Sequence, residues 1–202
     1  FEAARLIFPC DADLISQPSI EAVIQEVMSS RVDMGIVPVE NSTEGMVSQT
    51  LDLVAGGPRL YVVREVQLPI RHCLVSLGAP EQITRVHSHP QALAQCRTWL
   101  KTNFPAAKTM MASSTSEAAQ IAASEPSSAA IASEYAAQLY GLKLLAENIS
   151  DIPENITRFW VLSRQMITAG EHAKTSLILT LANKPGSLYQ ALQVFAEKGI
   201  NL

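Results

Sequence analysis

The sequence predicts an α/β fold, because a short run of strand length is followed by a loop and a helical pattern three times along the chain. The three runs are Met34–Val39, Arg85–His87 and Met110–Ala112. The composition is that of a globular protein, since 48% of the 202 residues are hydrophobic and 17% are charged. A chain of this length can hold one fair-sized domain or two small ones.

The first helix and strand are predicted from apolar spacing. Five apolar residues at helical intervals predict a helix over 20–28 with Ser19 as its cap: Ile20, Val23, Ile24, Val27 and Met28. The continuous run Met34–Val39 is typical of a buried parallel strand, and Glu40–Ser42 follows at its carboxyl end. Ligands bind at that end of the strands in open α/β sheets, so this segment is a candidate ligand contact.

Two capping boxes predict helix starts after the other two runs. They are Ser88-x-x-Gln91 and Ser114-x-x-Glu117. The apolar residues of the two helices are Leu93, Cys96, Trp99 and Leu100 in one, and Ala118, Ile121 and Ala122 in the other. Free backbone N–H groups and the helix dipole favour anions at such starts. Together with Glu40–Ser42, these corners could converge on one small acid.

The middle of the chain suggests two lobes. A second helix is predicted from Met46 to the stop signal Gly56-Gly57-Pro58. The β-prone segment Tyr61–Ser76, interrupted by Pro69, could then carry the chain from one lobe to another. The return crossing is expected near 148–151. This layout would insert one lobe into the other.

The remaining elements are shorter. A helix is predicted over Glu134–Tyr140, closed by Gly141, with a strand near 142–145. A polar, irregular linker follows Ser163. Beyond it the pattern predicts a strand over Thr175–Leu181, a Pro-Gly loop and a helix over 188–198, with Leu188, Leu192 and Phe195 on one side of that helix.

The segment Thr157-Arg158-Phe159 follows the turn Pro153–Asn155 and runs into an apolar strand. A planar guanidinium is well suited to grip a carboxylate, and a neighbouring hydroxyl can donate to an oxygen that is leaving. Such a site suits a small, anionic, oxygen-rich substrate. Taken alone, the triplet also fits the start of a strand with an exposed arginine and a core phenylalanine.

Four motifs occur together in order: Glu40–Gly45, Ser88–Cys96, Ser113–Thr115 and Asn155–Phe159. On these motifs the chain resembles the prephenate dehydratase family over essentially its whole length. The resemblance implies a two-lobed catalytic domain over 1–163, like the type 2 periplasmic binding proteins, with the active site between the lobes. Its outer lobe would comprise about 1–68 and 149–163, and the inserted lobe about 69–148.

The C-terminal part, 175–202, resembles the first half of an ACT regulatory domain, an α+β ferredoxin-like module, after a linker over 164–174. Phe1–Leu6 reads as the middle of a helix, and Gly199–Leu202 as the start of a strand. The resemblance implies that the family's first glycine-rich motif precedes Phe1. Its second regulatory motif is expected beyond Leu202.

The resemblance implies a carbon–oxygen lyase that converts prephenate to phenylpyruvate in L-phenylalanine biosynthesis. Thr157 matches the catalytic threonine, and we expect Arg158 to hold the pyruvyl carboxylate. The other expected substrate contacts are Asn41, Ser88 and Gln95, with Glu40, Ser42, Ser114, Thr115 and Phe159 as lesser candidates. Phenylalanine is expected to regulate the enzyme through the ACT module by binding at Gly186, Ser187 and Leu188. The module is also expected to make the protein a homodimer or homotetramer.

Two alternatives stay open. One is an arogenate dehydratase, which would use the same motifs on the amine analogue. The other is a sensor that binds an aromatic acid without chemistry, although a sensor would have no need of Thr157.

Composition argues against other classes of function. The net charge of −4 and the scattered lysines and arginines argue against nucleic acid as a partner. No run approaches the roughly 18 apolar residues of a membrane span. Cys10, Cys73 and Cys96 are odd in number and far apart, which favours reduced thiols in the cytoplasm. His87 and His89 together with Cys73 and Cys96 match no zinc template, so no metal is expected, and a redox-neutral elimination requires no cofactor.

Overall fold

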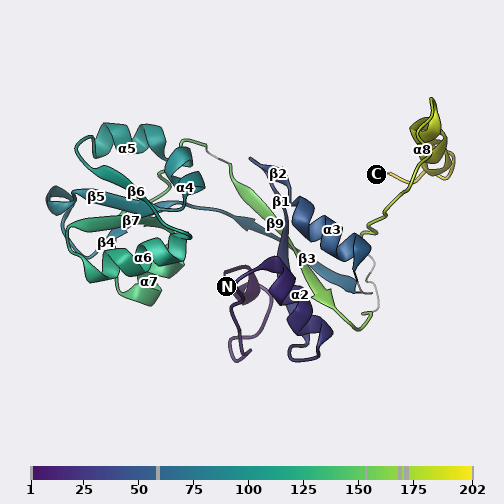
Figure 1. Ribbon diagram of the computed structural model, residues 1–202, viewed down its shortest axis with the longest axis horizontal. Coiled ribbons are helices and arrows are strands. Elements are labelled where there is room, and N and C mark those ends of the chain that lie inside the picture. Colours follow the sequence, from purple (N-terminus) through teal and green to yellow (C-terminus); the bar gives the residue numbers. More distant parts are fainter. Residues whose placement is uncertain (1, 58–59, 153, 168–169, 171–172, 202) are drawn as a thin grey trace. The chain divides into compact units, whose positions relative to one another are not determined.

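The computed structural model describes residues 2–57, 60–152, 154–167, 170 and 173–201. It forms two compact units, Phe1–Met166 and Ile167–Leu202, which are described separately (Figure 1). The first unit contains two β-sheets with helices against them. Within the described ranges, no helix is both long enough and apolar enough to cross a bilayer.

The first sheet has the strand order β2-β1-β9-β3 and is antiparallel throughout. Its strands are β1 (Met34–Asn41), β2 (Gly45–Met46), β3 (Tyr61–Pro69) and β9 (Ile156–Ser163). The prediction of a parallel strand over Met34–Val39 is therefore wrong. The apolar run reports burial, but the direction of the neighbouring strands depends on β9, which arrives from far along the chain. Along β1, burial in fact alternates from residue to residue.

Three helices accompany this sheet: α1 (Glu2–Arg5), α2 (Ile20–Met28) and α3 (Ser48–Gly56). The predicted cap of α2 is confirmed, because the Ser19 hydroxyl accepts a hydrogen bond from Ala22 N at 3.1 Å. Apolar side chains of α2 and α3 share one core with β1 and β9: Ile24, Val37, Val39, Trp160 and Leu162, with Leu51 and Val54 packed against them.

The second predicted helix begins later than expected. Met46 pairs with Glu40 as part of β2, and α3 starts only at Ser48. The apolar spacing had included Met46, but the short hairpin between β1 and β2 takes this residue. Pro58, part of the predicted stop signal, lies outside the described residues.

The second sheet has the order β6-β5-β7-β4-β8 and is mixed. Strand β5 is parallel to β6 and β7, whereas β4 is antiparallel to β7 and β8. The strands are β4 (Cys73–Ser76), β5 (Arg85–Ser88), β6 (Lys108–Met111), β7 (Ser128–Ala132) and β8 (Lys143–Ala146). The helices are η1 (Pro80–Gln82), α4 (Pro90–Gln95), α5 (Arg97–Asn103), α6 (Thr115–Ser124) and α7 (Glu134–Tyr140).

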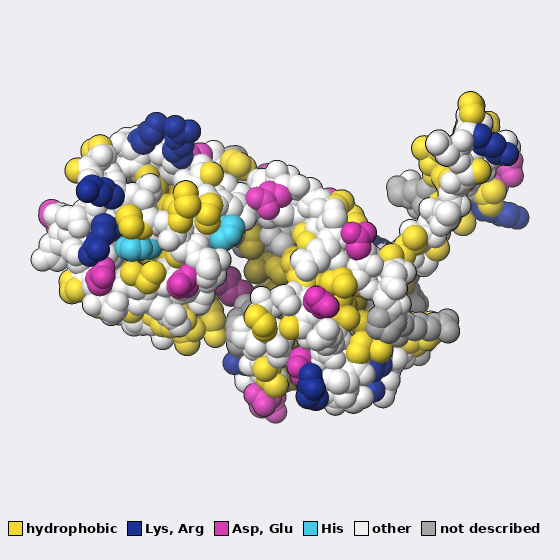
Figure 2. All heavy atoms as spheres, viewed as in Figure 1, with side chains coloured by type: hydrophobic (Ala, Val, Ile, Leu, Met, Phe, Trp, Pro, Cys, Tyr) yellow, Lys and Arg dark blue, Asp and Glu magenta, His cyan; other side chains and the backbone are white. Residues whose placement is uncertain are grey.

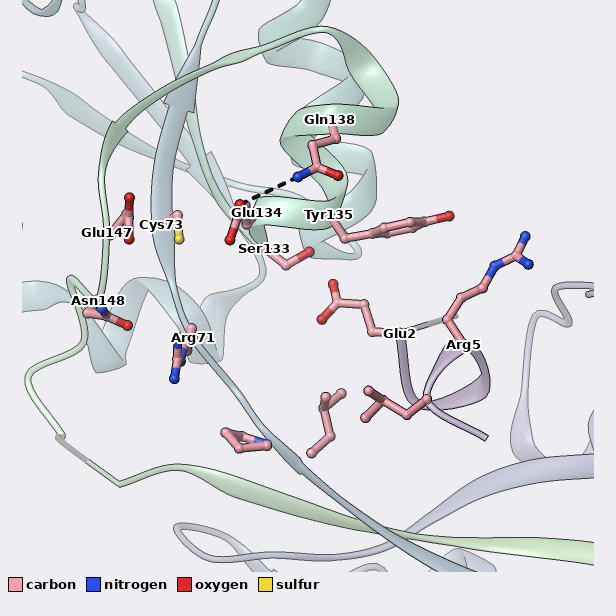
Figure 3. Close-up of a pocket in the computed structure, with 13 residues that line it drawn as sticks. Glu2, Arg5, Arg71, Cys73, Ser133, Glu134, Tyr135, Gln138, Glu147 and Asn148 are labelled. Atoms are coloured by element: carbon pink, nitrogen blue, oxygen red, sulfur yellow. Dashed lines mark hydrogen bonds between the residues drawn. The ribbon is translucent and has the colours of Figure 1, made fainter. Parts of the chain in front are cut away.

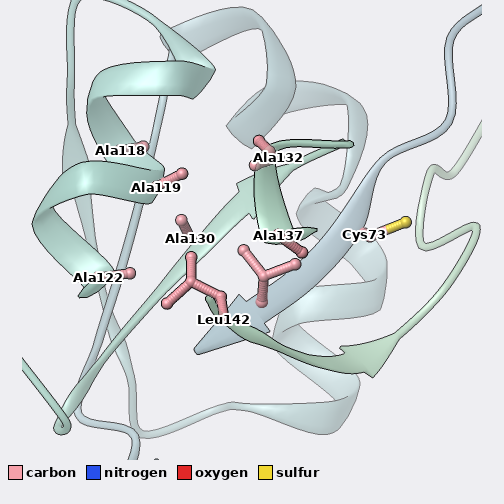
Figure 4. Packing of buried hydrophobic residues seen from close by; sticks show 10 residues of the cluster. Cys73, Ala118, Ala119, Ala122, Ala130, Ala132, Ala137 and Leu142 are labelled. Carbon is pink, nitrogen blue, oxygen red and sulfur yellow. The ribbon is translucent and has the colours of Figure 1, made fainter. Parts of the chain in front are cut away.

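Helices cover both faces of the second sheet with different side chains. On the face of α6 and α7 the core is built mainly of alanine, which lets helix and sheet backbones approach closely (Figure 4). The other face packs larger residues against α4 and α5: Leu74, Val86, Leu100, Ile131 and Ile149. Strand β7 serves both cores, since Ala130 and Ala132 face one side and Ala129 and Ile131 the other.

The capping box predicted at Ser88 is wrong by one residue. Ser88 is still part of β5, and its hydroxyl donates to the Ile131 carbonyl at 2.7 Å. Helix α4 starts at Pro90, and His89 is its N-cap. A residue before proline is held in an extended conformation, so the cap has to be His89. The expected single helix is also divided at Cys96 into α4 and α5.

The capping box at Ser114 is confirmed in its first half. The Ser114 hydroxyl accepts from Glu117 N at 3.0 Å. The Glu117 carboxylate accepts from the backbone N–H and hydroxyl of Ser113, one residue before the cap, both at 2.6 Å. These hydrogen bonds hold the pKa of the Glu117 carboxyl below its ordinary value. The helix over Glu134–Tyr140 is also confirmed, and Gly141 ends it with φ +66°.

Two segments join the sheets, from β3 to β4 and from β8 back to β9. They are hydrogen-bonded to each other, since Ile70 N donates to the Asn155 carbonyl at 2.7 Å and Ile149 N donates to the His72 carbonyl at 2.9 Å. The returning segment also caps α5, because the Asp151 carboxylate accepts from the N–H groups of Thr98 and Trp99 at 2.7 and 3.0 Å. Pro153 lies outside the described residues.

In the second unit, α8 (Ser187–Glu197) confirms the predicted helix. The strand predicted over Thr175–Leu181 is wrong, because these residues form no strand. A strand requires a hydrogen-bonded neighbour, and the described part of this unit supplies none. Residues 200–201 form no strand either, and Leu202 lies outside the described range. Apolar side chains of the unit are exposed, and Figure 2 shows apolar atoms on its surface. The exposed apolar residues include Leu177 and Ile178 before α8, and Leu188, Tyr189, Leu192 and Val194 within it.

Gly35 allows α2 to lie close to β1. A Cβ atom at Gly35 would come within 2.7 Å of Val23 Cγ1 and 2.8 Å of Val27 Cγ2. We expect Gly35→Ala to lower the free energy of unfolding by about 1–3 kcal/mol, the usual range for overpacking. Gly56→Ala is the matched control, since a Cβ there meets no atom within 4 Å. This second change should be neutral or stabilise by about 0.4–1 kcal/mol. Urea denaturation of both variants tests the difference, and equal effects would contradict the packing argument.

Candidate functional site

A β-bulge in β1 decides which side chain lies beside Thr157. Pro38 pairs with Phe159 and Glu40 pairs with Arg158, so Val39 is an extra residue in the ladder. The bulge places Asn41 opposite Thr157 on one face of the sheet. Without the extra residue, Glu40 would occupy that position, because a shift of one residue moves every following side chain to the other face.

Helix α3 satisfies the backbone groups that the bulge frees. Thr50, which is fully buried, donates its hydroxyl to the Pro38 carbonyl at 2.6 Å. Val47 N donates to the Val39 carbonyl at 2.9 Å. Pro38 itself has no N–H to offer to a ladder, which is why proline inside a sheet is found at bulges.

Four polar side chains beside Thr157 form a closed ring of hydrogen bonds. Asn41 Nδ2 donates to Asn155 Oδ1 at 2.8 Å, and Asn155 Nδ2 donates to Gln95 Oε1 at 3.2 Å. Gln95 Nε2 donates to Thr43 Oγ1 at 3.1 Å, and Thr43 Oγ1 donates to Asn41 Oδ1 at 2.6 Å. Gln95 belongs to α4 on the second sheet, Asn41 is the last residue of β1, and Thr43 and Asn155 lie just after β1 and just before β9. The ring therefore joins the two lobes.

The orientation of the ring follows from backbone donors to Asn41 Oδ1, of which Glu44 N–H, at 3.3 Å, is the more distant. Thr43 N–H donates to Asn41 Oδ1 at 2.9 Å, and a backbone N–H can only donate. This contact identifies the oxygen of the Asn41 amide and places its nitrogen toward Asn155 and Thr157. Each of the other amides then has one orientation that completes the ring.

The Thr157 hydroxyl is an acceptor within this network. Asn41 Nδ2 donates to Thr157 Oγ1 at 2.8 Å. The hydroxyl proton therefore has to be directed elsewhere, and within the described ranges it meets no protein acceptor. The side chain is nearly buried, with 9% of its surface exposed. A ligand oxygen that reached Thr157 would meet a hydroxyl already oriented as a donor.

Arg158 lies on the opposite face of the same strand. Its guanidinium forms ion pairs with Glu40 (Nη1 to Oε2, 3.2 Å) and with Glu65 (Nε to Oε2, 3.6 Å). The second distance is too long for a hydrogen bond. The hydroxyl and guanidinium that adjoin in the sequence are thus separated by the alternation of the strand, and the guanidinium already has two carboxylate partners.

The structure separates the other predicted residues from Thr157. Ser42 holds the start of β9, since its N–H donates to the Ile156 carbonyl and its hydroxyl accepts from Ile156 N, both at 2.9 Å. Ser88 is fully buried with its hydroxyl bound to a neighbouring strand. Ser114 and Thr115 begin α6 on the second sheet, and Phe159 is half-buried on the Thr157 face of β9. The side chains that meet at the ring are those of Asn41, Gln95 and Thr157.

A pocket of about 380 Å³ adjoins this face of the first sheet. Leu68, the partner of Thr157 in the β3–β9 ladder, lines it. Figure 3 shows α1, the end of β3 and the first turn of α7 around the same space, with Glu2 pointing toward that turn. The charged lining residues are Glu2, Arg5, Arg71, Glu134 and Glu147. Arg5 also donates to the Cys10 carbonyl at 2.9 Å. The volume is suited to a small metabolite.

The buried thiols are chemically inert. Burial raises the pKa of Cys73, at the pocket wall, and raises the pKa of Cys96 to about 12. Both remain protonated near neutral pH, so neither is a nucleophile. Both cysteines lie in the apolar clusters of the second sheet. Among the described residues no cluster of metal-ligating side chains occurs.

A family model described as prephenate dehydratase matches residues 1–167. The chain belongs to the prephenate dehydratase family. It is 44% identical over 193 residues to the bifunctional chorismate mutase/prephenate dehydratase of Stutzerimonas stutzeri, covering 94% of this chain and 53% of that protein. It is 40% identical over 198 residues to the prephenate dehydratase of Lactococcus lactis, covering 94% of this chain and 70% of that protein. The chain thus spans about half the length of the bifunctional relative.

A solved structure of this family has the same fold. The prephenate dehydratase of Arthrobacter aurescens, crystallised in complex with L-Phe, matches with a TM-score of 0.82 and 33% identity, covering 100% of this chain and 69% of that one. The predicted two-lobed, periplasmic-binding-protein-like α/β fold is thereby confirmed. The ACT half and the roles of individual residues stay predictions.

Sequence reasoning missed three members of the network. Asn155 and Thr43 lay inside the family motifs but were not selected, and His72 lay in a segment interpreted only as β-prone. Asn155 could have been found, because it precedes Thr157 by two residues and alternate strand residues share a face. His72 carries no such signal. Its contact, Nε2 to Gln95 Oε1 at 2.8 Å, joins residues 23 apart in the sequence.

Thr43 tests the ring through stability. Thr43→Val keeps the shape of the side chain but leaves Gln95 Nε2 without its acceptor and Asn41 Oδ1 without one donor. We expect a loss of about 1–3 kcal/mol in the free energy of unfolding, the cost of an unsatisfied buried polar group. Thr43→Ser retains the hydroxyl and should lose much less. Denaturation of the two variants measures the difference, and a Val variant as stable as the Ser variant would exclude the ring as a stabilising feature.

Proposed function

We propose that the intact protein is a prephenate dehydratase, a carbon–oxygen lyase that converts prephenate to phenylpyruvate in phenylalanine biosynthesis. The observation that carries the proposal is the Thr157 hydroxyl, which accepts from Asn41 at 2.8 Å and so keeps its proton free to donate. Its partner in the β3–β9 ladder, Leu68, lines the pocket. Membership of the prephenate dehydratase family supports it. The three cysteines, free in the structure, support action in a reducing cytosol.

The reaction requires help at the leaving oxygen. The carbon–carbon bond to the ring carboxylate breaks and its electron pair enters the ring, while the ring carbon–oxygen bond breaks and the oxygen leaves with a proton as water. A hydroxyl is a much weaker acid than the near-neutral groups that general acid catalysis prefers. Thr157 is therefore proposed to donate a hydrogen bond to the oxygen as negative charge develops on it. Carbon dioxide, water and the phenylpyruvate anion account for all atoms of the prephenate dianion and of one proton taken up from solvent.

The pyruvyl carboxylate also requires a cationic partner. Arg158 would have to exchange Glu40 or Glu65 for the substrate, since both carboxylates already pair with it. Arg71 lines the pocket itself. We propose Arg71 as the guanidinium that holds the substrate, with Arg158 fixing the β1–β9–β3 ladder on the other face. A bidentate grip at one end leaves the ring carboxylate free to depart.

Arogenate is the second candidate substrate, because the charge of the pocket lining suits its ammonium group. Three carboxylates, Glu2, Glu134 and Glu147, line the pocket against two guanidiniums. An ammonium group on the ligand would be attracted to this acidic excess, whereas prephenate carries only negative charge. The amine analogue therefore has a specific electrostatic argument in its favour.

Regulation by phenylalanine is proposed for the second unit. Gly186, with φ +85°, precedes α8 and adopts a conformation that favours glycine, so a ligand can approach the backbone at Gly186, Ser187 and Leu188. The exposed apolar residues of α8 and of 177–181 support assembly into a homodimer or homotetramer, because such a surface is covered in most stable proteins. By linkage, phenylalanine inhibits only if the inhibited conformation binds it more tightly.

Thr157 is the first residue to test. We expect Thr157→Ala in the intact protein to lower kcat for prephenate by about 10²–10³, the usual loss for one transition-state donor, with KM nearly unchanged. Thr157→Ser should retain much more activity, because it keeps the hydroxyl. The formation of phenylpyruvate measures both variants. Wild-type rates in both would remove the catalytic assignment.

Substrate preference is the second test of function. We expect the intact protein to turn over prephenate, and the ratio of kcat/KM for prephenate and arogenate to shift toward prephenate in Glu134→Gln, since this change removes one negative charge from the lining. Glu44→Gln is the matched control, because Glu44 is exposed and outside the lining residues. Binding of either acid without turnover would instead favour a sensor.

A further inference from the structure

The ring beside Thr157 is held at two of its oxygens by donors from outside. In the first lobe, Thr43 N–H donates to Asn41 Oδ1 at 2.9 Å. At the other side, His72 Nε2 lies 2.8 Å from Gln95 Oε1. The same oxygen accepts from Asn155 Nδ2, so it is identified as the acceptor of the Gln95 amide. His72 Nε2 therefore has to carry a hydrogen, which defines the tautomer of the His72 imidazole.

If every hydrogen bond of the ring ran in the opposite direction, Thr157 would donate to Asn41 instead of accepting from it. With the amides of Asn41, Asn155 and Gln95 all flipped, the Asn41 oxygen would face Thr157, and the hydroxyl would donate its proton to Asn41 rather than to a ligand. The flipped Asn41 amide would turn its nitrogen toward Thr43 N–H, and the flipped Gln95 amide would turn its nitrogen toward His72 Nε2–H. Two donors would then face each other at both places, at the cost of an unsatisfied buried group each time.

We propose that His72 is a positioning residue for Thr157: its Nε2–H donates to Gln95 and so keeps the ring in the sense that leaves the Thr157 proton free for the leaving oxygen. The proposal rests on the function proposed above. His72 is not among the residues that line the pocket, and it acts through Gln95, Asn155 and Asn41. Gln95, expected to contact substrate, then serves with it as a positioning residue, because its oxygen has two donors and its amide is bound to Thr43.

His72 is well placed to hold one orientation. Only 7% of its surface is exposed, and Gln95 is 8% exposed, so water does not compete freely for this hydrogen bond. The His72 carbonyl accepts from Ile149 N at 2.9 Å, which ties its backbone to the returning segment between the sheets. The Gln95 carbonyl accepts from Asp151 N at 2.6 Å in that same segment. The backbones of His72 and Gln95 are therefore both hydrogen-bonded to the same segment, residues 149–151.

The first experiment compares His72→Gln with His72→Leu in the intact protein. The Gln amide nitrogen can donate at a reach similar to Nε2, whereas Leu cannot donate. We expect Leu to lower kcat about 10-fold with KM nearly unchanged, because a misdirected donor acts on the transition state rather than on binding. Gln should restore most of the loss. His87→Leu is the control, since His87 is a buried histidine of the second sheet outside the ring.

A double-mutant comparison separates positioning from general damage. If His72 acts through the Thr157 hydroxyl, His72→Leu should add little to the loss of kcat already caused by Thr157→Ala. A 10-fold loss in both backgrounds would show that His72 acts independently of Thr157 and would overturn the proposal. The same conclusion would follow if His72→Gln were as impaired as His72→Leu.

Nitrogen-15 NMR of histidine-labelled protein tests the proton position without any turnover. We expect the His72 signals, assigned by their loss in His72→Gln, to show a proton on Nε2. A His72 imidazole protonated at Nδ1 alone would overturn the proposal, because Nε2 could not then donate to Gln95. If the wild type turns over neither prephenate nor arogenate, the proposed function fails, and this measurement alone decides whether His72 sets the sense of the ring.

Discussion

The extra residue at Val39 in β1 determines the arrangement of side chains around Thr157. Proline at position 38 cannot donate to a ladder, and the carbonyls that the bulge frees are bound by Thr50 and Val47 at the start of α3. After the bulge, Asn41 stands opposite Thr157 and Glu40 stands opposite Arg158. One inserted residue thus places the Asn41 amide beside the Thr157 hydroxyl. It also places the Glu40 carboxylate beside the Arg158 guanidinium.

The division of β9 into two faces separates two kinds of chemistry. On one face Arg158 is surrounded by two carboxylates, at the end of a core formed by α2, α3 and Trp160. On the other face the groups around Thr157 are neutral amides and hydroxyls. Neutral partners orient the Thr157 proton without transferring it, since none of them is a strong enough base. A carboxylate at position 41 would accept that proton instead.

Polar groups, rather than apolar contacts, join the two lobes at this place. Asn155, Gln95 and His72 are each less than 9% exposed, yet every one of them has a hydrogen-bond partner. Burying polar side chains costs free energy unless their hydrogen bonds are made, so such a network specifies one arrangement and tolerates few others. The two crossing segments, hydrogen-bonded to each other through Ile70 and Ile149, hold the same region from the backbone side.

The sequence by itself determined the α/β class, the helices over 20–28, 134–140 and 188–198, and the motifs that carry the family resemblance. These features depend on local spacing, caps and glycine stops, which act between residues a few positions apart. It also selected Thr157 and Asn41, which the structure joins by a hydrogen bond, because both lie in compact motifs. The helix start at Pro90 could have been predicted too, since proline constrains its neighbour.

Only the tertiary structure decided which of these residues meet. The direction of β1, the separation of Arg158 from Thr157, the use of Ser88 inside the sheet and the part played by His72 all depend on strands brought together from distant parts of the chain. Register and bulges set the face of each side chain, and they are fixed by packing and hydrogen bonding between segments rather than by local preference. For the same reason Thr175–Leu181 has the residue pattern of a strand but forms none, because no neighbouring strand within the described residues pairs with it.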